Sequence, residues 1–242
     1  MSPEIISDLA PTGVLRAGIN LSNFLRVTGK APAGEPEGVS PDMAREVAAR
    51  LGVPVKYVTF PSPGELADQA GKGVWDIGLI GAEPQRAETI AFTAAYVEIE
   101  ATYLVPPGSR LQTIADVDAP GVRIAVAGRS AYGLWLDRNI RHAELVRADS
   151  LGGATEQFIQ GKLEALAGLR PGLLADIDKL PGARIIEGKF SSVQQAIGTA
   201  KKNTAGAAFL SEFVEEAKAS GLVARLIERH NVRGRLSVAP AA

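Results

Sequence analysis

The chain has 242 residues, of which 46% are hydrophobic and 22% are charged, and these are ordinary proportions for a globular protein. Its formal net charge of -1, without any basic block, leaves nucleic-acid binding with no electrostatic basis. Cysteine is absent, which excludes disulfides, thiol nucleophiles and cysteine-ligated metals, and we expect neither a metal nor another cofactor. No apolar run approaches the roughly 18 residues of a membrane span. The length allows one large domain or two small ones.

The first part of the chain alternates short β-rich runs with helical patterns. The predicted strands lie at residues 14–19, 55–60 and 75–80. One helix should begin at Ser40, which can cap it, with Pro41 in the first helical position and Asp42 near the positive dipole end. It should end at Gly52, and a second helix should cover residues 63–71. This order favours a mostly parallel sheet with helices on its faces.

The same pattern begins again after a loop rich in proline and glycine. Strands are predicted at residues 122–127, 145–148, 163–167, 184–186 and 193–198. Helices are predicted at residues 130–138, 153–160, 171–180, 205–220 and 222–229. The sequence therefore predicts an α/β protein in which two halves share one order of elements.

Residues 83–96 contain the most informative motif. They follow the apolar run 77–80, include the single cation Arg86, and close with Phe92-Thr93 and then Tyr96. This stretch resembles the signature of family-3 extracellular solute-binding proteins, the two-lobed receptors of amino-acid ABC importers. The resemblance implies that Arg86 meets a ligand carboxylate, which suits a planar guanidinium that stays charged.

Further segments match the family across nearly the whole chain, at residues 38–44, 71–76 and 161–165. The resemblance implies the type 2 periplasmic-binding-protein fold, with residues 1–103 and 189–242 in one lobe and 104–188 in the other. Each lobe should hold a mostly parallel sheet flanked by helices. Two chain crossings should act as a hinge that closes around a ligand.

In the first lobe, the resemblance implies ligand contacts at the carboxyl ends of the strands, where open α/β sheets bind ligands. Asn20 would offer a polar group and Phe24 an aromatic wall, although a lone phenylalanine is more often a core residue. Glu83 stands where the family usually has threonine. It can pair with Arg86 or offer its charge to a cationic ligand group, and the sequence leaves both open.

In the second lobe, a turn at Gly128, Arg129 and Ser130 precedes a predicted helix. Its free backbone N–H groups can bind an anion, and Ser130 can also simply cap the helix. Arg129 adds positive potential, and Tyr132 can either close over a ligand or pack on the sheet.

A departure from the family pattern stands at Leu169, where the resemblance implies an aspartate that binds the ligand's ammonium group. Arg170 follows it and is a further candidate for ligand binding. Because an unpaired desolvated charge is costly, the ligand is expected to be an organic acid or another anion rather than an ordinary amino acid. Glu83 is the one acid of the first lobe that could restore ammonium binding and so admit a zwitterion.

We therefore expect a monomeric receptor for a small anionic or zwitterionic ligand, with an ABC permease as its partner. One alternative is an enzyme like the related cyclohexadienyl dehydratases, with Glu83 or Glu164 as the acid; Glu164 is better explained as a structural turn residue. Another is a cytoplasmic ligand sensor.

The N-terminus shows no signal peptide, so we expect a periplasmic protein if a signal was removed and a cytoplasmic one if Met1 is the natural start. His142 and His230 are expected to be solvated surface residues.

Overall fold

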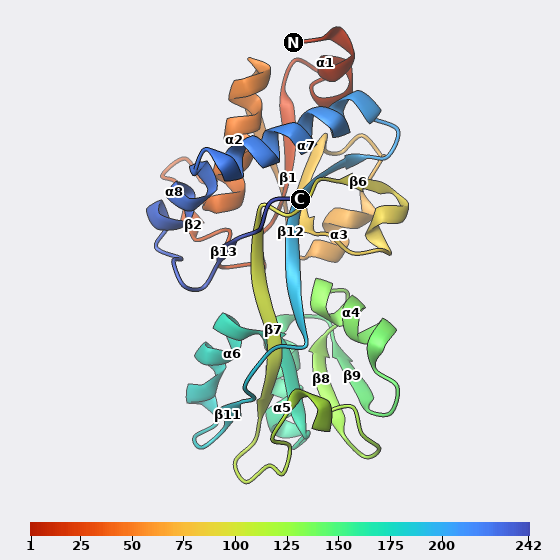
Figure 1. Cartoon of the computed structure of the whole chain (residues 1–242), viewed down its shortest axis with the longest axis vertical. Helices are drawn as coiled ribbons and strands as arrows, with labels where there is room; N and C mark the ends of the chain where they lie inside the picture. Colours follow the sequence, from red (N-terminus) through yellow and green to blue (C-terminus); the bar gives the residue numbers. More distant parts are fainter. The chain divides into compact units, whose positions relative to one another are not determined.

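A computed structural model describes all 242 residues of the chain (Figure 1). The chain forms two compact units, of which unit 1 comprises Met1–Glu98 and Gln194–Ala242, and unit 2 comprises Ile99–Val193. The chain passes between them once within strand β7 (Val97–Val105) and once within strand β12 (Ser191–Ala200). The predicted α/β class is confirmed, and each connection between the units is a continuous strand.

Unit 1 is built on a sheet with the strand order β4-β1-β5-β12. Strand β1 runs parallel to β4 and to β5, whereas β12 runs antiparallel to β5. Unit 1 contains parts of β7 and β12. Its other strands are β1 (Leu15–Asn20), β2 (Gly29–Lys30), β3 (Pro36–Glu37), β4 (Val55–Phe60), β5 (Ile77–Gly81), β6 (Ile90–Phe92) and β13 (Ser237–Val238). Its helices are α1 (Pro3–Leu9), α2 (Val39–Leu51), α3 (Pro63–Asp68), α7 (Thr204–Ala219), α8 (Leu222–Arg229) and the short 3-10 helix η1 (Arg86–Glu88).

Unit 2 is built on a sheet with the strand order β7-β10-β8-β9, in which β10, β8 and β9 run parallel and β7 runs antiparallel to β10. Its further strands are β8 (Arg123–Ala127), β9 (Glu144–Ala148), β10 (Ala165–Leu169) and β11 (Arg184–Ile185). Its helices are α4 (Ala131–Asn139), α5 (Leu151–Gln160), α6 (Arg170–Asp176) and the 3-10 helices η2 (Ile114–Asp116) and η3 (Ile177–Lys179). The helix predicted over residues 171–180 is thus divided into two. After Asp176 the backbone changes from an α-helix to a 3-10 helix, in which each hydrogen bond spans three residues instead of four.

Each unit has its own hydrophobic core. In unit 2, Tyr103 and Phe158 are almost fully buried, and the rings of Tyr103 and Trp135 lie 4.6 Å and 5.3 Å from the ring of Phe190. Aromatic rings at such distances contribute beyond the area that they bury. In unit 1, a cluster centred on Leu66 and Trp75 packs on the sheet. The units are therefore separately stabilised bodies.

Helix α2 begins earlier than the sequence predicts. Its first residue is Val39, and Gly38 takes the N-cap position with φ 148° and ψ -177°. Ser40, predicted as the cap, lies inside the helix with its side chain buried. The backbone of Gly38 passes so close to Arg26 that only a residue without a Cβ fits there. The predicted end is confirmed, since Gly52 adopts the left-handed conformation with φ 74°.

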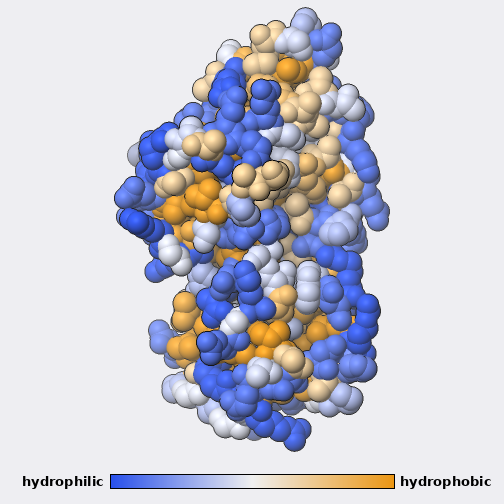
Figure 2. Space-filling view, in the orientation of Figure 1, coloured by the Kyte–Doolittle hydropathy of each residue, from blue (hydrophilic) through white to orange (hydrophobic).

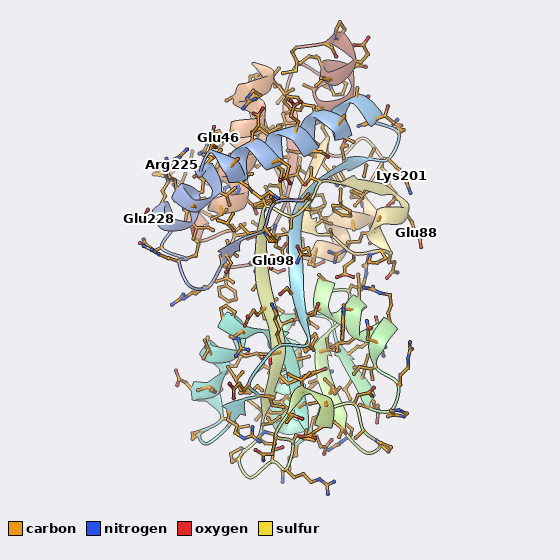
Figure 3. The ribbon with its side chains drawn as sticks, viewed as in Figure 1. Glu46, Glu88, Glu98, Lys201, Arg225 and Glu228 are labelled. Carbon is orange, nitrogen blue, oxygen red and sulfur yellow. The ribbon has the colours of Figure 1, made fainter.

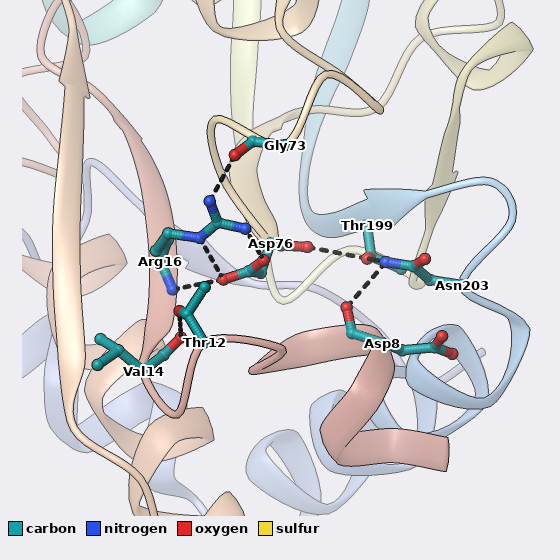
Figure 4. A network of polar contacts seen from close by, with 8 residues as sticks. All are labelled: Asp8, Thr12, Val14, Arg16, Gly73, Asp76, Thr199 and Asn203. Carbon is teal, nitrogen blue, oxygen red and sulfur yellow. Dashed lines mark hydrogen bonds and ion pairs between the residues drawn. The ribbon is translucent and has the colours of Figure 1, made fainter.

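An ion pair at the start of β1 secures the sheet of unit 1 (Figure 4). The Asp76 carboxylate accepts hydrogen bonds from the backbone N–H of Arg16 at 2.8 Å and from its Nε at 3.0 Å. Arg16 also donates to the carbonyl of Gly73. Thr199 Oγ1 donates to the carbonyl of Asp76 at 2.8 Å and so attaches β12 to this network.

Unit 2 repeats this device with Arg123 and Glu164. Glu164 accepts from the backbone N–H of Arg123 at 2.8 Å and from its Nε at 2.9 Å, while Arg123 Nη2 donates to the carbonyl of Lys162. The hydrogen bonds from Arg123 hold the pKa of Glu164 below its usual value, although burial opposes this. A carboxylate engaged in this way holds a strand and a turn together, so the predicted structural role of Glu164 is confirmed.

His230 is not the solvated surface residue that the sequence predicts. Its side chain is only 14% exposed, and its Nε2 lies 2.8 Å from an oxygen of Asp42 on helix α2. Its Nδ1 lies 3.5 Å from Thr28 Oγ1. Because Asp42 and Thr28 are distant in sequence, no local pattern marks the histidine as an internal contact. It joins the end of α8 to the start of α2.

The face shown in Figure 2 is mostly hydrophilic, with hydrophobic side chains in small groups. The large hydrophobic residues that are most exposed over the whole chain are Met1, Phe24, Val74, Leu151, Leu174 and Val238. None of the helices combines the length and the apolar character needed to cross a bilayer.

Candidate functional site

The carboxyl ends of three strands of unit 1 meet at one edge of its sheet. In the parallel register, Asn20 at the end of β1 lies opposite Phe60 at the end of β4, and Ile19 lies opposite Leu79 of β5. Strand β5 ends at Gly81. Open α/β sheets bind ligands beyond such an edge. The side chains that follow these strands are therefore the first candidates for a binding site.

Arg86 and Glu83 follow β5 at this edge, and both are buried, with 5% and 9% exposure. Nη1 of Arg86 donates to the carbonyl of Gly81 at 2.7 Å, and the backbone N–H of Ala87 donates to the carbonyl of Glu83 at 2.9 Å. The first contact folds the turn back onto the end of its own strand. The carbonyl accepts this hydrogen bond and so fixes the direction of the guanidinium.

Asn20 and Phe24 lie in the turn after β1. Asn20 is 5% exposed, and its Oδ1 accepts hydrogen bonds from the backbone N–H of Ser22 at 3.1 Å and from Ser22 Oγ at 2.8 Å. These bonds orient the side chain at the strand end. Phe24 is 44% exposed, so it is not a core residue in this structure. Unit 1 thus presents an amide, a guanidinium and a carboxylate at one sheet edge, with a phenylalanine in the adjoining turn.

A polar cluster that the sequence interpretation missed lies beside them, formed by Arg26, Ser40 and Tyr96. Ser40 Oγ lies 2.8 Å from Tyr96 Oη, and Nη1 of Arg26 donates to both oxygens, at 3.1 Å and 3.2 Å. All three side chains are buried. Nη1 of Arg26 also donates to the carbonyl of Leu79 in β5 at 3.0 Å. Nothing local distinguishes Arg26 from a surface arginine, since these partners lie in a helix, a loop and a strand that are distant in sequence.

In unit 2, the turn after β8 lies at the carboxyl edge of the parallel strands. Gly128 N–H donates to the carbonyl of Ala148 at 2.8 Å, and Arg129 adopts a left-handed backbone with φ 61°. Ser130 caps α4, because its Oγ accepts from the Gly133 N–H at 3.0 Å and donates to the Ala127 carbonyl at 2.7 Å. The capping explanation for Ser130 is therefore confirmed, and its use toward an anion stays a prediction.

Tyr132 is part of the core of unit 2 and is only 4% exposed. Burial raises its pKa to about 12, although a hydrogen bond with Ser130 opposes the shift. The phenol is therefore neutral near pH 7 and can serve as a hydrogen-bonding group but not as an anion. Of the two interpretations offered by the sequence, packing on the sheet describes this structure.

Arg170 begins helix α6 directly after β10, which is parallel to β8. Its Nε donates to a carboxylate oxygen of Glu100 at 2.7 Å, and its Nη2 donates to the carbonyl of Gly188. The guanidinium thus has an acidic partner within its own unit. Leu169, at the same sheet edge, carries no charge. The candidate ligand-binding groups at this edge of unit 2 are therefore the turn of residues 128–130 and Arg170, which is paired with Glu100.

The sequence profile of the bacterial extracellular solute-binding proteins, family 3, matches residues 23–232. No curated protein sequence matches the chain significantly.

Solved structures similar to this chain include a mutant of ArgBP from T. maritima, with 24% identity, TM-score 0.75, and 95% of this chain and 100% of that chain covered. Another is the amino acid ABC transporter substrate-binding protein AbpA from Streptococcus pneumoniae bound to L-arginine, with 17% identity, TM-score 0.73 and coverage of 92% and 96%. A third is the ancestral amino acid-binding protein AncCDT-1, a precursor of cyclohexadienyl dehydratase, with 19% identity, TM-score 0.73 and coverage of 93% and 98%. At these identities the likeness concerns the fold.

Proposed function

The chain belongs to family 3 of the bacterial extracellular solute-binding proteins, and from that premise we propose that it is a receptor that closes on a small carboxylate-bearing ligand and delivers it to an ABC-type importer. The family supports the binding of a solute. The nature of the ligand and the closure are inferences from the residues of this chain, and the importer is an inference from the family.

The observation that carries the proposal is the setting of Arg86. The residue is 5% exposed at the carboxyl edge of parallel strands, and the carbonyl of Gly81 accepts a hydrogen bond from its guanidinium. A shielded cation binds an anion more strongly than an exposed one, because water competes less. Asn20, at the end of the adjacent strand, adds a polar group for the same ligand.

The residues of unit 2 support an acidic ligand over an ordinary amino acid. We propose that Gly128, Arg129 and Ser130 bind an acidic group through backbone N–H groups and positive potential. Leu169 offers no charge for an ammonium group, and Arg170 is engaged by Glu100. An ordinary amino acid would therefore have to place its ammonium group against Glu83 or leave it poorly paired.

The first experiment identifies the ligand by mass spectrometry of small molecules released from the purified protein. Calorimetry with that compound then compares the wild type with Arg86→Ala. Loss of a charge-assisted hydrogen bond should weaken binding by about 1.5–3 kcal/mol. Arg147→Ala serves as the control, since Arg147 is an exposed residue of unit 2 paired with Asp137.

Unchanged affinity in Arg86→Ala would refute the anchoring role. Recovery of the ligand in altered form, with conversion lost in Glu83→Gln, would instead identify an enzyme that uses the receptor fold. The proposed receptor returns its ligand unchanged.

A further inference from the structure

Arg26 is a buried cation without an acidic partner. Its side chain is 1% exposed, which makes it one of the most deeply buried residues of the chain. Its hydrogen bonds go to Ser40 Oγ at 3.1 Å, the Leu79 carbonyl at 3.0 Å and Tyr96 Oη at 3.2 Å. All of these acceptors are neutral. A buried charge is costly unless an opposite charge compensates it, so the protein alone does not balance this guanidinium.

The part of the guanidinium that fits a carboxylate is not used. All three hydrogen bonds start from Nη1. Nε is buried and has no hydrogen-bond partner. The Nε–H and an N–H of Nη2 point along parallel directions and together match the two oxygens of a carboxylate. The network of Ser40 and Tyr96 therefore holds Arg26 in place while leaving its anion-binding edge without a partner.

The guanidinium groups of Arg26 and Arg86 both contact the carboxyl end of strand β5. Arg26 donates to the carbonyl of Leu79, and Arg86 donates to the carbonyl of Gly81, two residues further along β5. Carbonyl groups two residues apart in a strand point to the same side, roughly 7 Å from each other. Glu83 lies between Gly81 and Arg86 in the chain. Its single carboxylate can neutralise at most one of the two cations, Arg26 and Arg86.

The burial of Arg26 does not separate it from the other residues of this edge. Arg86 and Asn20 are each 5% exposed, close to the 1% of Arg26. A group shielded from bulk water in this way interacts strongly with an anion that reaches it. Both arginines are thus buried, both carry a positive charge, and both donate to carbonyls of strand β5.

We propose that Arg26 binds a second carboxylate of the ligand, so that the receptor takes a dicarboxylate in which one acidic group meets Arg86 and the other meets Arg26. This inference rests on the proposed function and specifies its ligand class. A second carboxylate on the ligand would supply the opposite charge that the neutral partners of Arg26 do not provide.

The test uses acids matched in length, succinate against butyrate and glutarate against valerate. Titration calorimetry on the full chain measures each affinity for the wild type, Arg26→Met, Arg26→Lys and Arg86→Ala. Arg50→Met is the control, because Arg50 is a half-exposed residue of unit 1 paired with Glu216. In the wild type, at least one diacid should bind roughly 10- to 100-fold more tightly than its monoacid.

Arg26→Met should remove this preference and leave the monoacid affinity nearly unchanged, Arg26→Lys should keep only part of it, and Arg50→Met should keep all of it. Equal affinities for diacid and monoacid in the wild type overturn the inference, and this comparison needs no variant to fold. Equal weakening of both acids by Arg26→Met also overturns it, since that result indicates a structural role.

The proposed function fails separately. If Arg86→Ala binds the diacid as tightly as the wild type while Arg26→Met loses it, Arg86 is not the anchor and Arg26 is. If the wild type binds none of the four acids, while mass spectrometry identifies a ligand with fewer than two acidic groups, the dicarboxylate inference falls and the receptor remains.

Discussion

Replacement of Gly38 by alanine should destabilise unit 1 strongly. Gly38 has φ 148° and ψ -177°, a combination that is essentially restricted to glycine and costs other residues about 1–3 kcal/mol. A Cβ at this position would lie 2.1 Å from the carbonyl oxygen of Arg26 and 2.8 Å from the Cα of Val27. Both are backbone atoms, so no side-chain rotation relieves the overlap. Forcing them apart adds a further cost of about 1–3 kcal/mol.

The two contributions sum to a loss of about 2–6 kcal/mol, which is a large part of the roughly 5–15 kcal/mol that stabilises a typical protein. A loss near 4 kcal/mol should lower Tm by about 8–16 °C for a chain of this length. Displacement of the Arg26 backbone would also disturb the hydrogen bond from Ser40 N–H to the Arg26 carbonyl, now 3.1 Å long. We therefore expect weaker ligand binding together with the lower stability.

Urea unfolding followed by circular dichroism measures the change, with Gly34→Ala as the matched control. Gly34 also has a positive φ, 85°, but a Cβ there meets no heavy atom within 4 Å. Its replacement should cost only the backbone contribution of about 1–2 kcal/mol. The steric argument is refuted if Gly38→Ala is no less stable than Gly34→Ala.

Three further predictions concern acid stability, ligand class and motion. Burial raises the pKa of Asp42, but the hydrogen bond with His230 and the charge of Arg45 outweigh burial and hold the pKa below its usual value. Because the folded pKa is depressed, the stabilising contribution of this carboxylate is complete above the unfolded pKa of about 3.9 and is lost as the pH falls through the folded pKa. The stability difference between wild type and Asp42→Asn, measured by denaturant titration, should thus be constant near pH 5 and shrink below about pH 4; a difference independent of pH contradicts this. In a thermal-shift screen, organic acids should stabilise the protein more than common amino acids do, and tight binding of several ordinary amino acids would contradict the interpretation of Leu169. Saturation with ligand should reduce the radius of gyration in small-angle scattering, since a ligand that binds the closed form better shifts the population toward it, and an unchanged radius would rule out closure.

Contacts across the chain crossings bear on the last of these predictions. Gln194 Nε2 donates to Glu98 Oε1 at 2.7 Å, and both residues belong to unit 1 at the points where β12 and β7 leave it. Figure 3 labels Glu98 on β7. Strand β13 pairs with the start of β7 through Val238 and Val97. The ends of the crossing strands are thus held in unit 1, and we expect any hinge motion to begin beyond them.

The order and type of most elements could be predicted from the sequence, because hydrophobic periodicity and caps act over a few neighbouring residues. Strand β4 (Val55–Phe60) and helix α8 (Leu222–Arg229) coincide with their predicted ranges. The motif around Arg86 likewise identified the family, since its residues are adjacent in the chain. These conclusions needed no knowledge of contacts between distant residues.

The features that the sequence missed depend on burial and on partners far along the chain. The start of α2 is set by the close approach of Gly38 to Arg26, and His230 is internal because Asp42 lies beside it. The setting of Arg26 follows from the side chains of Ser40 and Tyr96 and the carbonyl of Leu79. A charge becomes costly or useful only when its surroundings exclude water, and only the tertiary structure decides which arginine is placed in such surroundings.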